Sequence, residues 1–246
     1  MEELTELIRL SSKILVFTGA GVSTGSGIPD FRGPNGLWKR RKPVYFSDFL
    51  QSEEARIEHW DYKLEAFKLF QHARPNSAHV ALVSLERLGK LHTLVTQNID
   101  GLHQVAGNNP ELVIELHGTN RYIECLTCGA LTDPEPAFEE FLKTGASPRC
   151  QCGGLQKTAT ISFGQEMPQE ELNRAFRAAE EADLVISVGS TLEVEPAASV
   201  PLAAARSGVP YVIVNQGATA HDSIATLRIE GDVTEVLPQA VEQSQK

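Results

Sequence analysis

The sequence lacks long hydrophobic runs, a basic leader and any excess of positive charge. No segment reaches the ~18 uncharged apolar residues that a membrane-spanning helix needs, and the chain opens with Met1-Glu2-Glu3 rather than a basic signal-peptide segment. Its net charge of −10 argues against nucleic-acid binding, because phosphate contacts need a basic face. We therefore expect no membrane or nucleic-acid partner, and a cytoplasmic location.

Cysteine is also scarce, since the 246 residues contain only four. They form two close pairs, Cys125-x-x-Cys128 and Cys150-x-Cys152. In a reducing compartment, closely spaced thiols bind metal more often than they form disulfides. Four thiolates can close a tetrahedral zinc site that leaves no position open for catalysis. The sequence thus favours a structural zinc ion, with two disulfides or idle thiols as the alternative.

The apolar residues fall into short runs that end in small or polar residues. Such runs are typical of buried strands, and they occupy residues 13–18, 91–96, 112–116, 184–188 and 211–214. An alanine-rich helical stretch at 196–206 lies between the last two runs, and Gly208 follows it as a helix stop. A strand, a helix and a strand in this order predict an α/β fold with a doubly wound, parallel, Rossmann-like sheet.

Residues 119–160 interrupt this alternation. They hold all four cysteines and three prolines, with little strand-helix pattern. We predict that they form a small inserted zinc-binding module, and that 1–118 and 161–246 together form a discontinuous Rossmann-like domain. The polar tail from about Pro238 onward is expected to fray.

Small and polar groups follow each of the five predicted strands. They are Gly19-Ala20-Gly21, Gln97-Asn98-Ile99-Asp100, His117-Gly118, Gly189-Ser190-Thr191 and Asn215-Gln216-Gly217. In an open α/β sheet, ligands bind outside the carboxyl ends of the strands. These clusters therefore predict a single ligand crevice.

The glycines after the first strand suggest a dinucleotide, but they do not fit a dehydrogenase. That fingerprint requires a third glycine where this chain has Thr24, and an acidic residue about 20 positions further on. The corresponding region holds the cations Lys39 to Lys42 instead. Hydride transfer is therefore disfavoured, although the glycines still suit a pyrophosphate.

The segment 19–33, GAGVSTGSGIPDFRG, closely resembles the NAD-binding signature of the sirtuin family. The polar clusters after the later strands follow in that family's order and approximate spacing. The resemblance runs from about Lys13 to Val236 and implies an NAD-dependent protein lysine deacetylase. The products would be nicotinamide, O-acetyl-ADP-ribose and free lysine.

The resemblance also implies which residues bind NAD. They are Gly19, Ala20, Gly21, Thr24, Asp30, Phe31, Arg32, Gln97, Asn98, Asp100, Gly189, Ser190, Asn215 and Val233. Phe31 would shield the reactive sugar carbon from water, and Arg32 would hold a phosphate or a neighbouring carboxylate. Val233 would pack near the adenine.

His117 is the residue expected to act as general base. The imidazole titrates near neutral pH and can take a proton from a ribose hydroxyl. In the family mechanism this hydroxyl attacks the imidate that forms when the acyl-lysine oxygen displaces nicotinamide. Asn98 and Asp100 would surround the nicotinamide end. His79 and His103 lie in predicted helices, where packing is the more common role.

Two loops match those that bind the acyl-lysine peptide as an added strand in the family. The residues expected to contact the peptide are Ile161, Phe163, Gly164, Glu193 and Val194. Gln165 and the pair Lys157-Thr158 depart from the usual family residues. Both departures are expected at the edge of the cleft, where they would affect peptide preference more than catalysis.

One position bears on the acyl group. Relatives that remove succinyl or malonyl groups carry a tyrosine with an arginine three residues on. Here Tyr62 is followed three residues later by Glu65, whose charge would repel an acidic acyl group. The sequence therefore favours acetyl or other neutral acyl groups on lysine side chains.

Two other functions stay open at this point. A mono-ADP-ribosyltransferase would use the same NAD pocket but transfer ADP-ribose to a protein side chain. A non-catalytic module would sense NAD without turnover. His117 and the two peptide loops favour deacylation over the transferase, and the presence of Asn98, Asp100 and His117 argues against the sensor.

Overall fold

The computed structural model describes residues 1–30, 36 and 42–246. The helices are α1 (Glu2–Leu10), α2 (Phe46–Gln51), α3 (Glu53–His72), α4 (Ser77–Arg87), α5 (Leu102–Ala106), α6 (Pro134–Thr144), α7 (Gln169–Glu181), α8 (Ser199–Arg206) and α9 (Val233–Gln243). The strands are β1 (Ile14–Thr18), β2 (Leu91–Thr96), β3 (Val113–Glu115), β4 (Gly118–Cys125), β5 (Leu131–Thr132), β6 (Gln156–Thr160), β7 (Leu184–Val188), β8 (Tyr211–Asn215) and β9 (Leu227–Glu230). No helix in this described part is long and apolar enough to cross a membrane.

Six parallel strands form the main sheet in the order β3-β2-β1-β7-β8-β9. The strand order reverses between β1 and β7, which is the topological switch point of a doubly wound fold. The predicted parallel α/β sheet is thus confirmed. The five expected strands are β1, β2, β3, β7 and β8, whereas β9 carries little hydrophobic signal and was not predicted.

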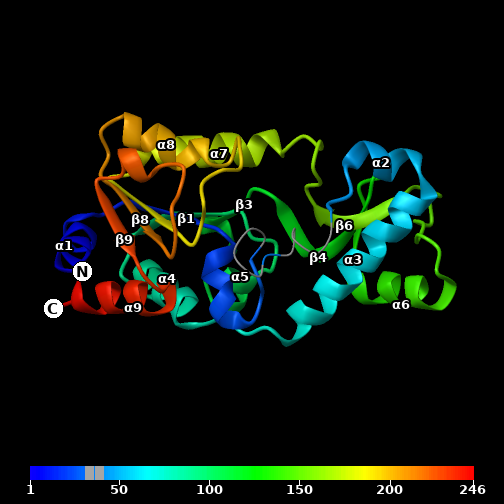
Figure 1. Cartoon of the computed structure of the whole chain (residues 1–246), viewed down its shortest axis with the longest axis horizontal. Helices are drawn as coiled ribbons and strands as arrows, with labels where there is room; N and C mark the ends of the chain where they lie inside the picture. The colour runs from blue at the N-terminus through cyan, green and yellow to red at the C-terminus, as the bar shows by residue number, and fades with distance from the viewer. Residues whose placement is uncertain (31–35, 37–41) are drawn as a thin grey trace.

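Helices cover both faces of this sheet (Figure 1). Alternate residues of β1 point to opposite faces: Ile14 and Val16 pack with α1, α4 and α9, while Leu15 and Phe17 pack with α7 and α8. All five residues of β1 are buried, because helices cover both faces of the sheet. This burial explains why the strands show as continuous apolar runs in the sequence.

The C-terminal tail does not fray, so that prediction is wrong. Residues from Val233 to Gln243 form α9, and Ala240 and Val241 are buried against the core. Pro238 lies inside this helix and cannot donate to the carbonyl four residues before it. That carbonyl, of Thr234, accepts a hydrogen bond from the Ser77 hydroxyl at 2.5 Å instead. The packing of α9 against α4 therefore accommodates the proline.

A smaller antiparallel sheet, β5-β4-β6, stands beside the main one (Figure 1). Its own core joins Trp60 and Leu64 of α3 to Ile123 of β4 and to Phe138 and Phe141 of α6. Helix α3 thus packs with the segment 119–160, although it precedes that segment by almost 50 residues. The exact division into domains at 119 and 160 stays a prediction.

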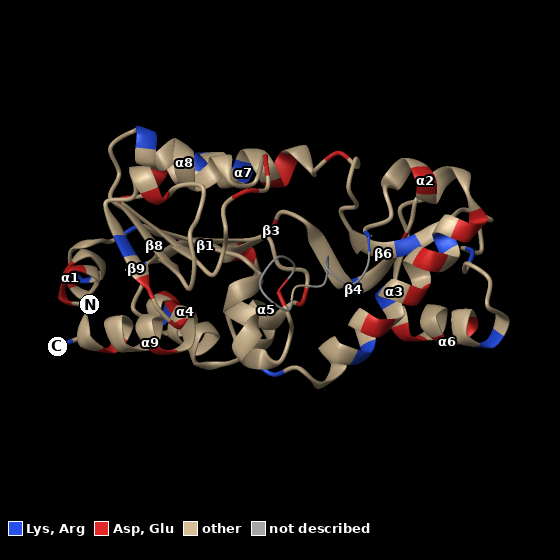
Figure 2. Ribbon diagram, viewed as in Figure 1, with Lys and Arg blue, Asp and Glu red and all other residues tan. Residues whose placement is uncertain are grey.

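Acidic side chains are placed where helix geometry favours them. Glu2, Glu53 and Glu170 stand in the first turns of α1, α3 and α7, where the positive end of the helix dipole stabilises a carboxylate. Figure 2 shows acidic residues on helices at both ends of the molecule. The negative net charge is therefore spread over the outer helices.

Candidate active site

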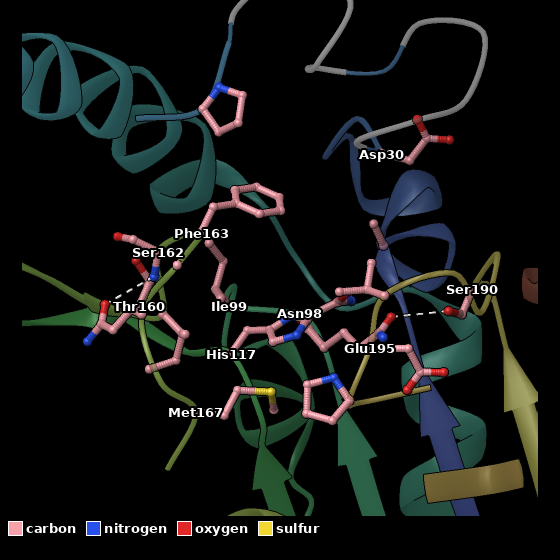
Figure 3. Close-up of a pocket in the computed structure, with 18 of the residues that line it drawn as sticks. Asp30, Asn98, Ile99, His117, Thr160, Ser162, Phe163, Met167, Ser190 and Glu195 are labelled. Atoms are coloured by element: carbon pink, nitrogen blue, oxygen red, sulfur yellow. Dashed lines mark hydrogen bonds between the residues drawn. The ribbon is translucent and has the colours of Figure 1, made fainter. Parts of the chain in front are cut away.

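A cavity of about 560 Å³ opens at the carboxyl ends of β1, β2, β7 and β8, on the side of the smaller sheet. Thirteen predicted site residues line it: Ala20, Gly21, Asp30, Gln97, Asn98, His117, Ile161, Phe163, Gly164, Gly189, Ser190, Val194 and Asn215. Figure 3 shows His117 between Asn98 and Met167, with Ser190 and Asp30 further along the cavity. The polar clusters predicted to meet in one crevice do so.

Two glycine turns press together at the switch point. A Cβ added to Gly189 would lie 2.4 Å from the backbone nitrogen of Val22, and one added to Gly21 would lie 2.7 Å from the Cα of Gly189. Gly189 also has a φ of +62°, which other residues rarely adopt. The close approach leaves no room for side chains at these positions, so bare backbone lines this part of the cavity, and such a surface lets a phosphate approach closely.

A hydrogen-bonded chain fixes the polar side chains behind the first glycine turn. The Asn98 amide donates to the Ser23 hydroxyl at 3.2 Å, and Ser23 donates to the Asp100 carboxylate at 2.7 Å. Asp100 also accepts a bond from the backbone nitrogen of Leu102 at 2.9 Å. Burial raises the pKa of the Asp100 carboxyl, and these two bonds oppose that shift. Asp100 therefore orients Ser23 and, through it, Asn98, but it does not line the cavity.

The imidazole of His117 is held in one tautomer. Its Nδ1 lies 3.1 Å from the carbonyl oxygen of Gln97. A carbonyl can only accept, so Nδ1 carries the proton and Nε2 carries the lone pair. The backbone of His117 is fixed by Ile161, whose nitrogen donates to the His117 carbonyl at 2.8 Å. This arrangement presents a base on a rigid support at the centre of the cavity.

Besides Asp100, three predicted NAD contacts lie elsewhere in the described structure. Gly19 supports the glycine turn, since a Cβ there would meet Gly189 and Ser190 at 2.8 Å. Thr24 is exposed and donates to the Gly21 carbonyl, and Val233 is buried in the core at the start of α9. Phe31 and Arg32 lie outside the described residues, as do the cations from Lys39 to Arg41. The roles given to these residues stay predictions.

The two predicted peptide loops face each other across the cavity. Ile161, Phe163 and Gly164 line one side and Val194 the other. Phe163 packs near Tyr45 with ring centroids 6.0 Å apart, and it keeps 39% of its surface exposed. Glu193 is exposed and accepts a hydrogen bond from Thr191 at 3.1 Å. Residues of both loops therefore line the same cavity.

Two sequence expectations at this end of the cavity need correction. Lys157 does not lie at the cleft edge: its side chain is fully buried, and its ammonium contacts the carbonyl oxygens of Thr158 and Thr160. Glu65 is exposed and is not among the residues that line the cavity. Tyr62 does line it, but the next lining residue on α3 is Lys63. The repulsion of acidic acyl groups by Glu65 therefore has no structural basis.

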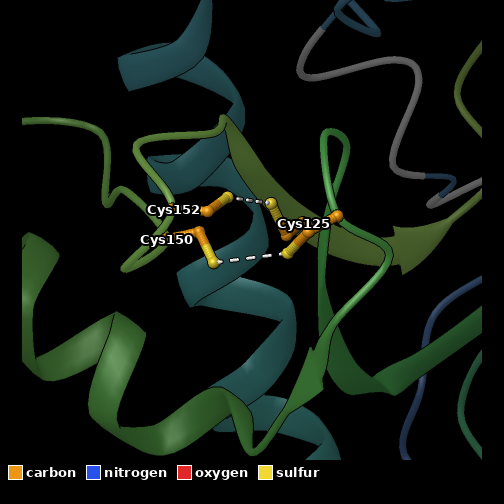
Figure 4. A group of neighbouring side chains, drawn as sticks. Cys125, Cys150 and Cys152 are labelled. Carbon is orange, nitrogen blue, oxygen red and sulfur yellow. Dashed lines mark hydrogen bonds between the residues drawn. The ribbon is translucent and has the colours of Figure 1, made fainter.

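The four cysteines meet at the tip of the smaller sheet (Figure 4). Their sulfur atoms all lie within 4.8 Å of one another, with Cys125 and Cys152 at 3.5 Å and Cys128 and Cys150 at 3.8 Å. Sulfurs around a tetrahedral zinc ion, with Zn–S bonds of about 2.3 Å, stand about 3.8 Å apart. Backbone amides of Thr127 and Cys128 point at the Cys125 sulfur, as in a zinc knuckle. The donor set therefore fits zinc, and the short Cys150-x-Cys152 spacing does not prevent closure.

Sequence reasoning missed three residues of the site. Ser23 lies inside the glycine motif, where its spacing gave no hint that it would link Asn98 to Asp100. His59 and Lys63 come from α3, far from every motif, and reach the cavity only because α3 packs on the smaller sheet. Their spacing of four residues, which places them one turn apart on a helix, is the signal that the sequence offers.

A family model and similar protein sequences assign the chain to the same family. A sequence model described as the Sir2 family matches residues 19–196. The chain is 44% identical over 238 residues to an NAD-dependent protein deacetylase of Rhodopseudomonas palustris, covering 96% of this chain and 94% of the relative. It is 46% identical to NAD-dependent protein deacetylase 1 of Bradyrhizobium diazoefficiens, covering 96% and 93%.

Solved structures match over the full length. One, of Sir2 with a p53 peptide and NAD⁺, has a TM-score of 0.90 at 37% identity and covers 100% of this chain and 98% of its own. Another, of a Sir2 variant with a deacetylated p53 peptide and 3′-O-acetyl ADP-ribose, has a TM-score of 0.89 at 37% identity, covering 99% and 98%.

Proposed function

The chain belongs to the Sir2 family, and from this membership we propose that it is an NAD-dependent protein lysine deacetylase. Acetylated lysine side chains of proteins or peptides are its substrates, and NAD is the co-substrate. The products are nicotinamide, O-acetyl-ADP-ribose and free lysine. The relatives named for this activity match almost the entire chain.

The observation that carries this function is the position of His117. Its protonated Nδ1 is anchored on Gln97, which leaves the Nε2 lone pair as the basic site of the ring. The ring lies between the glycine turns, which suit the pyrophosphate, and the loops that suit a peptide. A base at this junction can take the proton of a ribose hydroxyl as that oxygen attacks the transferred acyl group.

The remaining residues bind and orient the two substrates. The side-chain-free backbone at Gly21 and Gly189 suits the close approach of the pyrophosphate, and Ser190 and Asn215 suit the adenosine side. Asn98, held by Ser23 and Asp100, suits the carboxamide of the nicotinamide. Ile161, Phe163 and Val194, which line the cavity, suit the apolar stem of the lysine side chain.

Zinc bound by the four cysteines has a structural role in this proposal. The cluster belongs to the smaller sheet, and none of the four sulfurs lines the catalytic cavity. Four protein ligands complete the tetrahedral coordination, so no site is left for substrate or activated water. The four free thiols are consistent with a reducing compartment, and we propose the cytoplasm.

The test is an assay with an acetylated peptide and NAD, followed by mass spectrometry. We expect nicotinamide and deacetylated peptide to form in equal amounts, together with O-acetyl-ADP-ribose. ADP-ribose attached to protein without deacetylation would instead support a mono-ADP-ribosyltransferase. NAD binding without any product would support a non-catalytic sensor.

A further inference from the structure

The loop that follows β8, residues 216–222, connects two parts of the cavity that hold different substrates in the proposed function. It follows Asn215, which lines the cavity on the adenosine side. Further along, the backbone nitrogen of Ala220 donates to the carbonyl of Thr191 at 3.0 Å. Thr191 also lines the cavity, three residues before Val194 of the peptide loop. This backbone hydrogen bond therefore joins the adenosine side to the peptide side.

The peptide loop begins with a strained residue. Leu192 has a φ of +58°, which residues with a side chain rarely adopt. Such a conformation persists only where the surrounding structure holds it. The Leu192 nitrogen donates to the Ser190 hydroxyl at 3.2 Å, and the Leu192 side chain is only 2% exposed. The carbonyl just before it, of Thr191, is the one bonded to Ala220. The conformation of the peptide loop therefore depends on the position of the loop 216–222.

Arg228 of β9 binds both ends of the loop after β8. Its guanidinium donates to the carbonyls of Asn215 and Gly217 at 3.0 and 2.5 Å, and it pairs with the Asp222 carboxylate at 3.0 Å. Asp222 also accepts a hydrogen bond from the Thr219 hydroxyl at 2.6 Å. The loop is thus a hydrogen-bonded unit that is held to β9, the last strand of the main sheet.

A buried chain of three polar side chains attaches the same loop to the interior of the sheet. The Nδ1 of His221 lies 3.1 Å from the Tyr211 hydroxyl, which lies 3.0 Å from the Ser187 hydroxyl. Their exposed fractions are 5%, 0% and 1%. Ser187 belongs to β7 and Tyr211 to β8, and the other buried residues of both strands are apolar. A polar group in such surroundings is costly unless it is hydrogen-bonded, so the three side chains need one another.

None of these three side chains lines the cavity, so none touches a substrate there. Apolar residues of the same shape would cost the folded chain little free energy. A fully satisfied buried polar chain instead holds a structure in one arrangement. The arrangement held here is that of the loop 216–222, which both sides of the cavity share.

We propose that Tyr211 and His221 are positioning residues that order this loop in advance for both substrates. NAD meets the loop beside Asn215, and the acylated peptide meets it through Thr191. The inference rests on the proposed deacylase function and adds to it two residues that contact neither substrate. A loop that is already ordered costs neither ligand the entropy of ordering it.

Loss of this anchor has a specific thermodynamic consequence. If the loop is ordered in only a fraction of the molecules, the affinity of each ligand alone falls by that fraction. The first ligand to bind then orders the loop, so the second ligand binds without that cost. Binding of NAD and binding of peptide therefore become mutually dependent in a variant that lacks the hydrogen bond between Tyr211 and His221.

The test measures the affinities of ADP-ribose and of an acetyl-lysine peptide by calorimetry, each alone and each with the other at saturation. ADP-ribose has the adenosine and the pyrophosphate of NAD but no nicotinamide to release, so no turnover occurs. Tyr211→Phe removes only the hydroxyl. We expect it to weaken each ligand alone by about 3- to 10-fold, the usual range for a lost hydrogen bond. With the other ligand bound, both affinities should return to within about twofold of the corresponding wild-type values.

Further variants isolate the hydrogen bond between Tyr211 and His221. His221→Leu should reproduce the effect of Tyr211→Phe, and the double variant should lose no more than either single variant, because both changes remove the same bond. Ser187→Ala removes the other partner of the Tyr211 hydroxyl and leaves its bond to His221. It should therefore keep wild-type affinities, as should Tyr122→Phe, which removes a hydroxyl from an exposed tyrosine outside the cavity. Recovery of affinity with both ligands present also shows that a variant is folded.

The outcomes separate this inference from the proposed function. Equal weakening with and without the second ligand in Tyr211→Phe would overturn the inference, since it would indicate damage to one binding site. Unchanged affinities would overturn it too, as would a loss in Ser187→Ala as large as that in Tyr211→Phe. In each of these cases a wild-type enzyme that removes acetyl groups keeps the proposed function. If wild-type protein binds neither ADP-ribose nor the peptide, the proposed function fails, and this inference fails with it.

Discussion

Individual residues of the site act through their fixed neighbours. His117 is a base with a defined tautomer because its Nδ1 meets the Gln97 carbonyl, and Asn98 is oriented because Ser23 connects it to Asp100. All of these residues lie within the motifs found in the sequence, although Ser23 was not among the predicted site residues. The chemistry of the site could therefore be predicted from the motif, whereas the hydrogen-bonded support could not, because it depends on side-chain directions.

Replacing His117 by glutamine should abolish most turnover. Glutamine is similar in size and can hydrogen-bond, but it cannot take a proton near neutral pH. We expect kcat for deacetylation to fall by about 10²- to 10⁴-fold, the usual contribution of a positioned general base. The measurement is steady-state kinetics with an acetylated peptide, alongside NAD affinity by calorimetry, which should change little.

His72→Gln serves as the matched control, because His72 is exposed at the end of α3. It should keep wild-type kinetics. If His117→Gln keeps wild-type turnover, His117 is not the general base.

Gly189 should tolerate alanine much less well than Gly27 does. Both have positive φ, so alanine costs about 1–2 kcal/mol of strain at either position. A Cβ at Gly27 meets nothing within 4 Å, but one at Gly189 would collide with the Val22 nitrogen at 2.4 Å. We expect a larger loss of unfolding free energy and weaker NAD binding for Gly189→Ala, measured by urea denaturation and calorimetry. Equal losses in the two variants would contradict the close approach of the glycine turns.

At the scale of elements, the positions of short strands and loops depend on tertiary packing, which leaves no pattern in the sequence. The apolar runs identified β1, β2, β3, β7 and β8, because burial on both sheet faces removes polar residues from them. Strands β4, β5 and β6 gave no such pattern, since β5 is exposed and the buried residues of β6 are polar ones such as Lys157 and Thr160. Helix α3 is assigned to the smaller sheet by tertiary contacts, such as the packing of Trp60 on Phe138.

Loss of the zinc ligands should destabilise this smaller unit before the main sheet. We expect wild-type protein to contain one zinc ion per chain by elemental analysis, and Cys128→Ser to contain much less. Because the metal links the loop after β4 to the loop before β6, its loss should lower the unfolding temperature and reduce activity. Thermal circular dichroism with and without a chelator measures the effect, and added zinc should restore wild-type protein.

A zinc-free protein with normal stability and activity would show that the cysteines have no structural metal role. If a chelator abolished activity immediately, before any loss of structure, the zinc ion would not be purely structural.

At the scale of the molecule, two layers of helices enclose the parallel sheet, and the smaller sheet completes the cavity at its carboxyl edge (Figure 1). This architecture buries several basic groups that the unfolded chain would expose. Burial lowers the pKa of His79 to about 4 and that of His103 to about 3. It also lowers the pKa of Lys63 to about 7 and that of Lys157 to about 8.

Stability should therefore rise with pH from about 5 to above 8. When folding lowers the pKa of a group, the unfolded state binds more protons than the folded state at any pH between the folded and the unfolded pKa. Lowering the pH within this range therefore favours unfolding. For His79 and His103 the window lies between their folded pKa values and the unfolded value of about 6.5. Within it, each histidine changes the free energy of unfolding by up to about 1.4 kcal/mol per pH unit. For Lys63 and Lys157 the window lies between their folded pKa values of about 7 and about 8 and the unfolded value of about 10.4.

Urea denaturation at pH 5.5, 7 and 8.5 measures this dependence. The raised pKa values of Asp100 and Glu115 act in the opposite direction at lower pH. His103→Asn should show a shallower decline below pH 6.5 than wild type. A free energy of unfolding that increases on acidification from pH 7 to 5.5 would contradict the predicted sign.

The sequence by itself determined the strand cores, the glycine turn, the candidate base and the four metal ligands. Each of these depends on residue type and on short spacing, which local chain geometry converts directly into structure. Tertiary structure alone decided that α9 is buried despite Pro238, that Lys157 is in the interior and that Lys63, rather than Glu65, faces the cavity. Those outcomes depend on how α3, α4 and the smaller sheet pack together, and contacts between residues far apart in the chain leave no local pattern.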